Sequence, residues 1–210
     1  MSFDLEAANA ELRNQTPEAI VQWALGQKSR PIVTTNFRPY EATLLHACAQ
    51  SLPTMPVIWC DSGYNTRATY LHAEQTIATL KLNVSLYVPK QSAAHRDTVM
   101  GGIPKVDDPH HAVFTQQVKL EPFKRALAEH RCDLWFTNLR KGQTAFRNSL
   151  DIVSHGSDGV LKVSPFFYWS DSELDGYITA HGLTSETDYY DPTKVHEDRE
   201  CGLHTQSVTG

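Results

Sequence analysis

The fold is decided by the stretch PIVTTNFRPY, residues 31–40. Its apolar, β-branched first half predicts a short buried strand, and a helix is expected to follow from about Glu41 to Gln50. A loop between a strand and a helix N-terminus is a natural anion site, because unpaired backbone N–H groups point out of the first helical turn. Arg38 would add a positive charge there. A plain connection without a ligand is the simpler interpretation, since the loop has no glycine.

The same strand–loop–helix pattern repeats further along the chain. Residues 56–60 predict a second strand, which ends in Asp61-Ser62-Gly63-Tyr64, and residues 84–88 predict a third. Strands that alternate with helices in this way form a parallel sheet with right-handed crossovers. Because ligands bind beyond the carboxyl ends of such strands, the loops at 34–38 and 61–64 are expected to meet at one ligand-binding edge.

A basic loop follows the fourth expected strand, Leu134 to Thr137. The loop has the sequence NLRKGQTAFR, residues 138–147, in which three cations accompany a glutamine. Arginine offers bidentate contacts to phosphate or sulfate, so this loop is a candidate clamp for such groups. A solvated basic loop is the alternative interpretation.

The other segments predict the layers that cover the sheet. We expect two helices in residues 4–26, a helix from Lys119 to about His130, a hairpin over 151–165 and a capped helix from Ser170 to about His181. Residues 89–117 are rich in Gly and Pro and show little periodicity, which predicts a mobile loop with one short helix. The adjacent His110 and His111 in that loop are interpreted as solvated side chains rather than metal ligands.

The composition predicts one globular domain spanning residues 1–210. Of the 210 residues 40% are hydrophobic, and the formal net charge is −5. A nucleic-acid binder is usually basic, whereas an acidic protein can still bind a small anion where its few cations converge. No stretch approaches the roughly 18 apolar residues that a membrane span needs, and the N-terminus has no signal-peptide pattern. We therefore expect a cytoplasmic protein that binds neither nucleic acid nor membrane.

Four widely spaced cysteines, none paired at metal-ligand spacing, divide into two kinds. Cys48, Cys60 and Cys132 lie in apolar or periodic segments and are expected to be buried thiols. Cys201 lies near the C-terminal end, in Arg199-Glu200-Cys201-Gly202-Leu203-His204. Nearby Arg and His side chains favour the thiolate, which is the nucleophilic form of cysteine. We expect residues 183–210 to form a flexible tail that carries this thiol; an incidental tail cysteine is the alternative.

Taken in order, these motifs resemble the phosphoadenylyl-sulfate (PAPS) reductase family over roughly residues 30–182 and again at the tail. The loop at 34–38 stands in the place of the family's Ser-rich phosphate loop, and residues 61–64 are similar to its Asp-Thr-Gly-Tyr motif. Lys119-Leu120-Glu121-Pro122 resembles its Lys-Val-Glu-Pro helix start, residues 135–147 resemble its Trp-Phe…Leu-Arg-Arg…Gln…Arg loop, and Glu200 to His204 is the most specific match. The resemblance implies an α/β, adenine nucleotide α-hydrolase-like fold: three layers, a mostly parallel twisted sheet with helices on both faces, and a mobile C-terminal tail.

The resemblance also implies an oxidoreductase of sulfate assimilation. Such an enzyme reduces PAPS to sulfite and adenosine 3′,5′-bisphosphate through an S-sulfocysteine, here on Cys201, with Arg199 and His204 beside it and thioredoxin or glutaredoxin as the external reductant. The related adenylyl-sulfate reductases hold an iron–sulfur cluster on paired cysteines that this chain lacks, so no bound cofactor or metal is expected. The sequence does not decide between a monomer and a homodimer. The implied substrate-binding residues are Thr34, Thr35, Asn36, Phe37, Arg38, Asp61, Gly63, Tyr64, Lys119, Arg140, Lys141, Gln143 and Arg147.

The chain departs from the family pattern in two places. Arg38 stands where the family has a loop glycine, and the stretch between Leu183 and Cys201 is short and lacks the family's Gly-Tyr…Ser…Gly-Asp segment. Two other functions stay open on these grounds. One is an ATP-pyrophosphatase-type ligase or sulfurtransferase, although the chain lacks the Ser-Gly-Gly-x-Asp-Ser loop of that group. The other is a non-catalytic nucleotide-binding relative of the reductases.

Overall fold

A six-stranded sheet forms the centre of the computed structural model, which describes residues 4–105, 107–156 and 159–194. The strands follow the spatial order β3-β2-β1-β4-β6-β5. All neighbouring pairs are parallel except β5 with β6, so the predicted mostly parallel sheet is confirmed. The strands are β1 (Pro31–Thr35), β2 (Pro56–Cys60), β3 (Asn83–Tyr87), β4 (Leu134–Phe136), β5 (Val153–His155) and β6 (Leu161–Val163).

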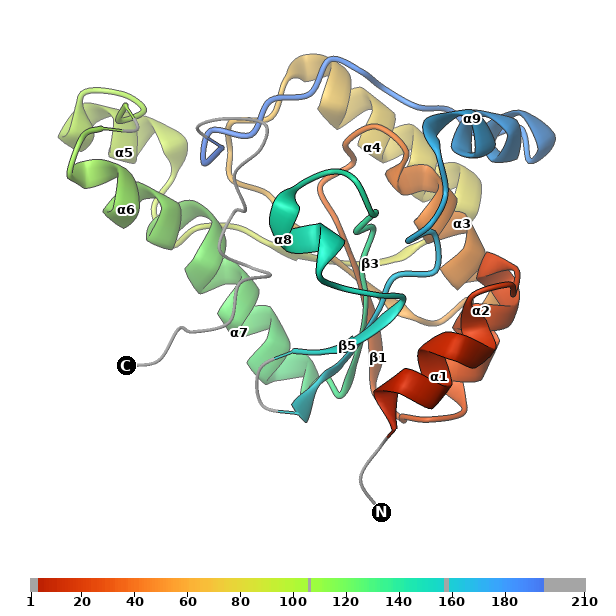
Figure 1. Ribbon diagram of the computed structural model, residues 1–210. Coiled ribbons are helices and arrows are strands. Elements are labelled where there is room, and N and C mark those ends of the chain that lie inside the picture. The colour runs from red at the N-terminus through yellow and green to blue at the C-terminus, as the bar shows by residue number, and fades with distance from the viewer. Residues whose placement is uncertain (1–3, 106, 157–158, 195–210) are drawn as a thin grey trace.

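Helices cover both faces of this sheet, and Figure 1 shows α1 to α4 and α9 gathered on one side with α5 to α7 on the other. Among the described residues no helix has the length and apolar composition needed to cross a membrane. The helices are α1 (Leu5–Leu12), α2 (Pro17–Leu25), α3 (Glu41–Ser51), α4 (Arg67–Leu80), α5 (Ala93–Met100), α6 (His110–Thr115), the π-helical turn η1 (Gln116–Leu120), α7 (Glu121–His130), α8 (Ala145–Asn148) and α9 (Asp171–Ala180).

Strand residues alternate between two separate cores, as the period of two along a strand requires. Val33 of β1 and Phe136 of β4 face the larger core, which contains the apolar faces of α2, α3 and α9. Ile32 and Trp135, their sequence neighbours, face a smaller core against Phe123 of α7. Because every central strand is buried on both faces, these strands are near-continuous apolar runs, which is why the sequence predicts them well.

Several expected elements are confirmed closely. Thr16 caps α2 and is followed by Pro17 at the first helical position, as the Thr-Pro pair predicts. Ser170 and Glu173 form the predicted capping box of α9, and β5 and β6 form the predicted hairpin.

The prediction for residues 89–117 is wrong, because most of this segment is helical in α5, α6 and η1. Helix α5 shows no apolar periodicity in the sequence, because the side chain that it buries is Arg96, which is 1% exposed. The Arg96 guanidinium lies over the rings of Tyr64 and Phe114 and donates to the carbonyl of Gln91. Aromatic faces and hydrogen bonds therefore stabilise this buried cation in place of an apolar stripe.

The helix expected to open at Lys119 instead continues from α6 without a break. The N–H of Glu121 bonds to the carbonyl of Gln116, an i to i−5 bond that widens the turn just before Pro122. Proline has no N–H to donate, and the wider turn lets the helix pass through it. Lys119 consequently sits inside a π-helical turn, a feature frequent at functional sites.

Candidate functional site

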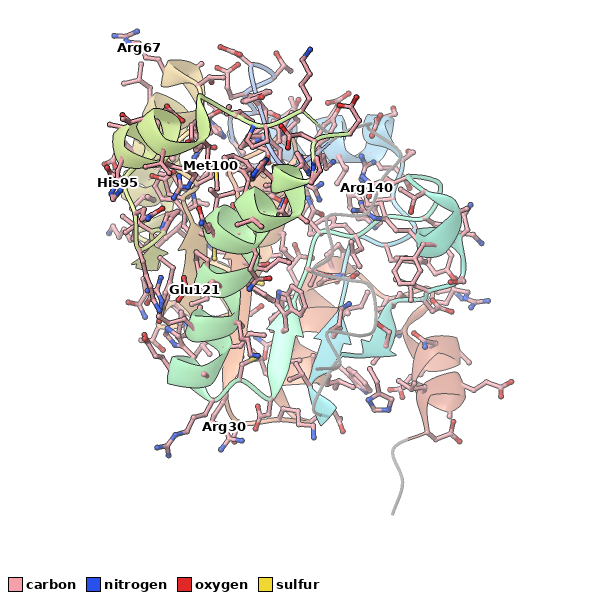
Figure 2. The ribbon with its side chains drawn as sticks, turned by 90° about the vertical axis from the view of Figure 1, so that its left-hand side faces the viewer. Arg30, Arg67, His95, Met100, Glu121 and Arg140 are labelled. Atoms are coloured by element: carbon pink, nitrogen blue, oxygen red, sulfur yellow. The ribbon has the colours of Figure 1, made fainter. Side chains whose placement is uncertain are left out.

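The predicted site residues gather where the loops after β1, β2 and β4 leave the carboxyl edge of the sheet. The chain moves from β1 to β2 on one side and returns to β4 on the other, so β1 and β4 flank the point where strand order reverses. Ligands of open α/β sheets bind in the crevice at such a point. Figure 2 shows Arg140, which follows β4, at this edge and Arg30, which precedes β1, at the opposite edge.

The loop after β1 carries two residues in the left-handed region, Phe37 at φ 54° and Tyr40 at φ 67°. A non-glycine residue in this region is strained, and such strain clusters at functional sites. Arg38 is not among the left-handed residues, so an arginine in place of the family's glycine brings no backbone strain of that kind. The loop is held internally by the N–H of Phe37, which donates to the Thr35 hydroxyl at 2.9 Å.

Glu41, in the first turn of α3, fills the anion position that this loop creates. Its carboxylate accepts from the Asn36 N–H at 2.6 Å, from the Thr35 hydroxyl at 2.7 Å and from Arg38 Nε at 2.8 Å. The residue is only 5% exposed. The donors of this loop thus hold an anion, but that anion belongs to the chain itself.

Asp61 and Tyr64 shape the loop after β2 rather than line its pocket. The Asp61 carboxylate accepts from the Gly63 N–H at 2.9 Å and from the Tyr70 hydroxyl at 2.9 Å. The Tyr64 hydroxyl donates to Asp97 at 2.6 Å, which ties the loop to α5.

The basic loop after β4 contacts the loop after β1. Arg38 Nη2 donates to the carbonyl of Asn138 at 3.1 Å, and the Arg140 guanidinium lies 5.4 Å from the centre of the Tyr40 ring. Arg140 also pairs with the exposed carboxylate of Asp171 at 2.5 Å. These contacts hold the loop that carries Arg38 against the loop that carries Arg140 at the reversal point.

Gln143 organises the rest of the basic loop. Its side-chain oxygen accepts from the backbone N–H of Arg140 at 3.2 Å and from the buried guanidinium of Arg147. Lys141 lies over the ring of Tyr168, 5.3 Å from its centre. The loop therefore holds its arginines in fixed positions and leaves Lys141 exposed.

Lys119 lines a separate pocket of about 290 Å³ between the β1 and β2 loops. Its ammonium pairs with Asp191 at 2.5 Å and donates to the Thr193 hydroxyl at 3.1 Å. Burial by itself would raise the pKa of Asp191, but Lys119 and the hydrogen bonds from Thr193 outweigh it and hold that pKa below its usual value. The pocket is lined by Asn36, Cys60, Ser62, Asn65, Val118, Lys119, Tyr189, Tyr190, Asp191, Pro192 and Thr193.

Much of this lining comes from residues 183–194, an extended segment that we call the strap. Figure 1 shows it, in blue, leaving the end of α9 and crossing the carboxyl edge of the sheet. Ser185 accepts from the Tyr40 N–H, and the carbonyl of Asp188 accepts from Thr66 and Thr69 at the start of α4. The strap thus spans the β1 loop, α4 and Lys119.

Sequence reasoning missed the strap residues and, in the β2 loop, Ser62 and Asn65. Asp191-Pro192-Thr193 carries the signature of a turn in which a side-chain oxygen caps the backbone, since Asp191 accepts from the Thr193 N–H at 3.0 Å. That signature predicts a turn, but nothing local in it predicts a contact with Lys119, 72 positions away.

The described cysteines are poor candidates for a thiolate at neutral pH. Burial raises the pKa of Cys48 far above its ordinary value and raises the pKa of both Cys60 and Cys132 to about 12. The prediction that all three are buried is correct for Cys48, whereas Cys60 and Cys132 are partly exposed. The predicted catalytic residues Arg199, Cys201 and His204 lie outside the described residues.

Comparison with known proteins gives one family. The family model described as "Phosphoadenosine phosphosulfate reductase domain" matches residues 30–190. A protein named phosphoadenosine 5′-phosphosulfate reductase from a Synechococcus strain is 34% identical, with 95% of this chain and 97% of the relative covered. One of the same name from Xylella fastidiosa is 31% identical, with 96% and 94% covered.

Two solved structures have the same architecture as this chain. A PAPS reductase from Candida auris, solved as a phosphate complex, superposes with a TM-score of 0.75 at 21% identity, covering 88% of this chain and 90% of that one. An NH3-dependent NAD synthetase from Campylobacter jejuni superposes with a TM-score of 0.55 at 10% identity, covering 87% and 75%. The predicted adenine nucleotide α-hydrolase-like fold is therefore confirmed.

Proposed function

This chain belongs to the phosphoadenosine phosphosulfate reductase family, and on that premise we propose that it reduces PAPS to sulfite and adenosine 3′,5′-bisphosphate. The observation that carries the proposal is the convergence of cations at one edge of the sheet in a chain whose net charge is −5. Arg38 and Arg140 make the contacts between the β1 and β4 loops, and Lys119 lines a pocket together with Asn36 of the β1 loop. Such a cluster suits a ligand that carries phosphate and sulfate groups.

The cations bind the phosphosulfate end of the substrate in this proposal. Negative charge builds up on the phosphate as the S–O bond to it breaks, and fixed cations in a water-poor site stabilise that charge strongly. Arg147 is buried and held by Gln143, so it is positioned before the ligand arrives. The Candida auris relative, whose structure contains phosphate, supports an anion site in this fold.

The Cys201 thiolate attacks the sulfate sulfur in the first step. A Cys–S bond to that sulfur forms as the S–O bond to the phosphate breaks, and the electron pair leaves with adenosine 3′,5′-bisphosphate. The product is an S-sulfocysteine. One thiolate of reduced thioredoxin or glutaredoxin then attacks the Cys201 sulfur, which releases sulfite with the bonding pair. The second thiol of the donor resolves the mixed disulfide, so the donor supplies the two electrons.

Two further points belong to the same proposal. The three described cysteines have strongly raised pKa values, which supports Cys201 as the nucleophile, with Arg199 and His204 favouring its thiolate. The reaction needs no bound cofactor, and it belongs in the cytoplasm, where thioredoxin keeps thiols reduced.

Mass spectrometry tests the proposal directly. After the protein is mixed with PAPS in the absence of a reductant, we expect a sulfonate adduct on Cys201, and Cys201→Ser should lose both the adduct and sulfite release. Cys132→Ser is the matched control and should keep both, because that thiol hydrogen-bonds to the backbone carbonyl of Leu134 at the start of β4. Sulfite release by Cys201→Ser would overturn the mechanism. Binding of adenosine 3′,5′-bisphosphate without any sulfite release would instead indicate a non-catalytic nucleotide-binding protein.

A further inference from the structure

The strap places a carboxylate of its own on the cation of the pocket. Asp191 Oδ2 lies 2.5 Å from Lys119 Nζ, and the two side chains are only 8% and 9% exposed. Asp191 Oδ1 accepts from both the N–H and the hydroxyl of Thr193, at 3.0 and 2.6 Å. Within the described part of the chain, the hydrogen bonds and the ion pair of this carboxylate therefore come from Lys119 or from the strap itself.

The strap also limits the room in the pocket. Tyr189, Tyr190, Asp191, Pro192 and Thr193 all line it. A nucleotide carrying additional phosphate and sulfate groups needs both the space and the cation that the strap holds.

Beyond Leu183, which packs against the larger core, the strap is held by several polar contacts. These include hydrogen bonds from the Tyr40 N–H and from the Thr66 and Thr69 hydroxyls, a contact between Thr184 and His72, and the Lys119 ion pair. A buried lysine left without a partner would be strongly destabilising, whereas a lysine that exchanges one anion for another stays paired. When a ligand phosphate or sulfate displaces Asp191, Lys119 therefore exchanges one anionic partner for another.

We propose that Asp191 is an internal anion that pairs with Lys119 until an anionic group of the nucleotide displaces it and releases the strap. This inference rests on the proposed function, because it takes PAPS and its bisphosphate product as the ligands. The opposite role is that Asp191 stays in place and orients Lys119 toward the ligand. The two roles predict effects of opposite sign when the charge on Asp191 is removed.

The first experiment measures binding of adenosine 3′,5′-bisphosphate to Asp191→Asn by calorimetry. Asparagine keeps the shape of the side chain and its turn-forming oxygen but no longer competes as an anion. We expect binding to tighten by about fivefold or more, because the ligand no longer competes with the Asp191 carboxylate for Lys119. Asp188→Asn is the matched control: it removes the same charge from the same strap, where the backbone carbonyl makes the contacts to Thr66 and Thr69, and should leave the affinity unchanged.

The outcomes separate this inference from the function on which it rests. Equal or weaker binding by Asp191→Asn, with normal binding by the wild type, would overturn the displacement and assign Asp191 to positioning Lys119, while the proposed function stands. Failure of both proteins to bind the bisphosphate would overturn the proposed function and this inference together.

A second experiment uses the wild type alone and does not depend on how a variant folds. Hydrogen exchange of peptides covering residues 186–194 is compared with and without adenosine 3′,5′-bisphosphate. Displacement predicts faster exchange of the strap amides, including that of Thr193, on ligand binding, because their bonds to Asp191 and to the turn are lost. Slower exchange would mean that the strap closes over the ligand and would sink the proposal.

Discussion

At the scale of single residues, carboxylates of the chain sit where sequence reasoning expects a ligand. Glu41 takes the N–H and hydroxyl donors of the β1 loop, and Asp191 takes the ammonium of Lys119. The two carboxylates differ in the secondary structure that carries them. Glu41 belongs to a helix of 11 residues and also contacts Arg38, whereas Asp191 lies on a strap without helix or strand. We therefore interpret Glu41 as a fixed part of the loop and Asp191 as the exchangeable one.

Glu41→Gln tests the fixed role. The glutamine amide has no negative charge to offer the donors of Asn36, Thr35 and Arg38. We therefore expect the free energy of unfolding to fall by about 2 kcal/mol, as for the loss of hydrogen bonds to a charged group. Urea unfolding followed by circular dichroism measures it. Glu74→Gln, on the exposed face of α4, is the control and should change stability by less than about 0.5 kcal/mol. Equal stability of Glu41→Gln and the wild type would contradict this role.

Single residues also show where sequence reasoning stops. Lys119 could be chosen from its motif, and the structure places it in a pocket. Asp61 and Tyr64 could be chosen in the same way, yet their side chains bond to Tyr70 and Asp97 and shape the loop instead. A motif indicates which residues are near a site. Whether a side chain lines the pocket or holds the loop depends on its rotamer, which is set by partners remote in sequence.

At the scale of elements, the helical run from α6 through α7 was only half predictable. Glu121 and Pro122 signal a helix start, which is correct for α7 taken alone. The π-helical turn before them shifts the helical period by a residue, and α5 buries an arginine in place of apolar groups. Both features remove the periodicity from which a helix is recognised.

The contact between α2, α3 and α9 contains titratable side chains whose state should affect stability. The Tyr177 hydroxyl donates to Glu18 at 2.6 Å, and His46 Nδ1 lies 2.8 Å from the same hydroxyl oxygen. Because the phenol has given its only proton to Glu18, His46 must be the donor in that bond. The His181 ring lies 4.5 Å from that of His46, centre to centre.

Acidification is expected to weaken this contact. Burial, and secondly the nearby His181, lower the pKa of His46 below its ordinary 6.5, so the folded state favours the neutral ring. A group with a lowered folded pKa contributes stability above the unfolded pKa and loses it as pH falls through the folded one. We therefore expect the melting temperature of the wild type to fall as pH drops from about 7 to about 5. The melting temperature of His46→Asn should fall less over the same range.

The matched control for this pH dependence is His95→Asn, which replaces an exposed histidine on α5, seen at the surface in Figure 2. It should show the same pH dependence as the wild type. His72 also has a pKa lowered by burial and will contribute part of the wild-type loss. An identical pH profile for wild type and His46→Asn would show that the contact between α2, α3 and α9 does not sense pH.

At the scale of the whole molecule, the sheet could be predicted because its strands are buried on both faces. Ile32 and Val33, adjacent in β1, face different cores, and both must be apolar. The edge of the sheet at which ligands bind follows from the parallel order alone. The strap could not be predicted, because a segment with no apolar period takes its position from contacts to the β1 loop, α4 and Lys119 that only the folded chain brings together.

The charge of the molecule, −5 overall, makes the cationic edge a local exception, and this has a measurable consequence. Binding of adenosine 3′,5′-bisphosphate should weaken by about tenfold between about 50 and 500 mM NaCl, because added salt shortens the distance over which partly exposed charges act. Contacts of Arg38, Lys119 and Arg140 with carboxylates keep the effect below that of bare cations. Calorimetry across the salt series measures it, with adenosine as the control ligand, whose affinity should stay constant. A bisphosphate affinity as constant as that of adenosine would mean that the phosphates are bound by neutral donors, and the arginines of the β1 and β4 loops would then lose their assigned role.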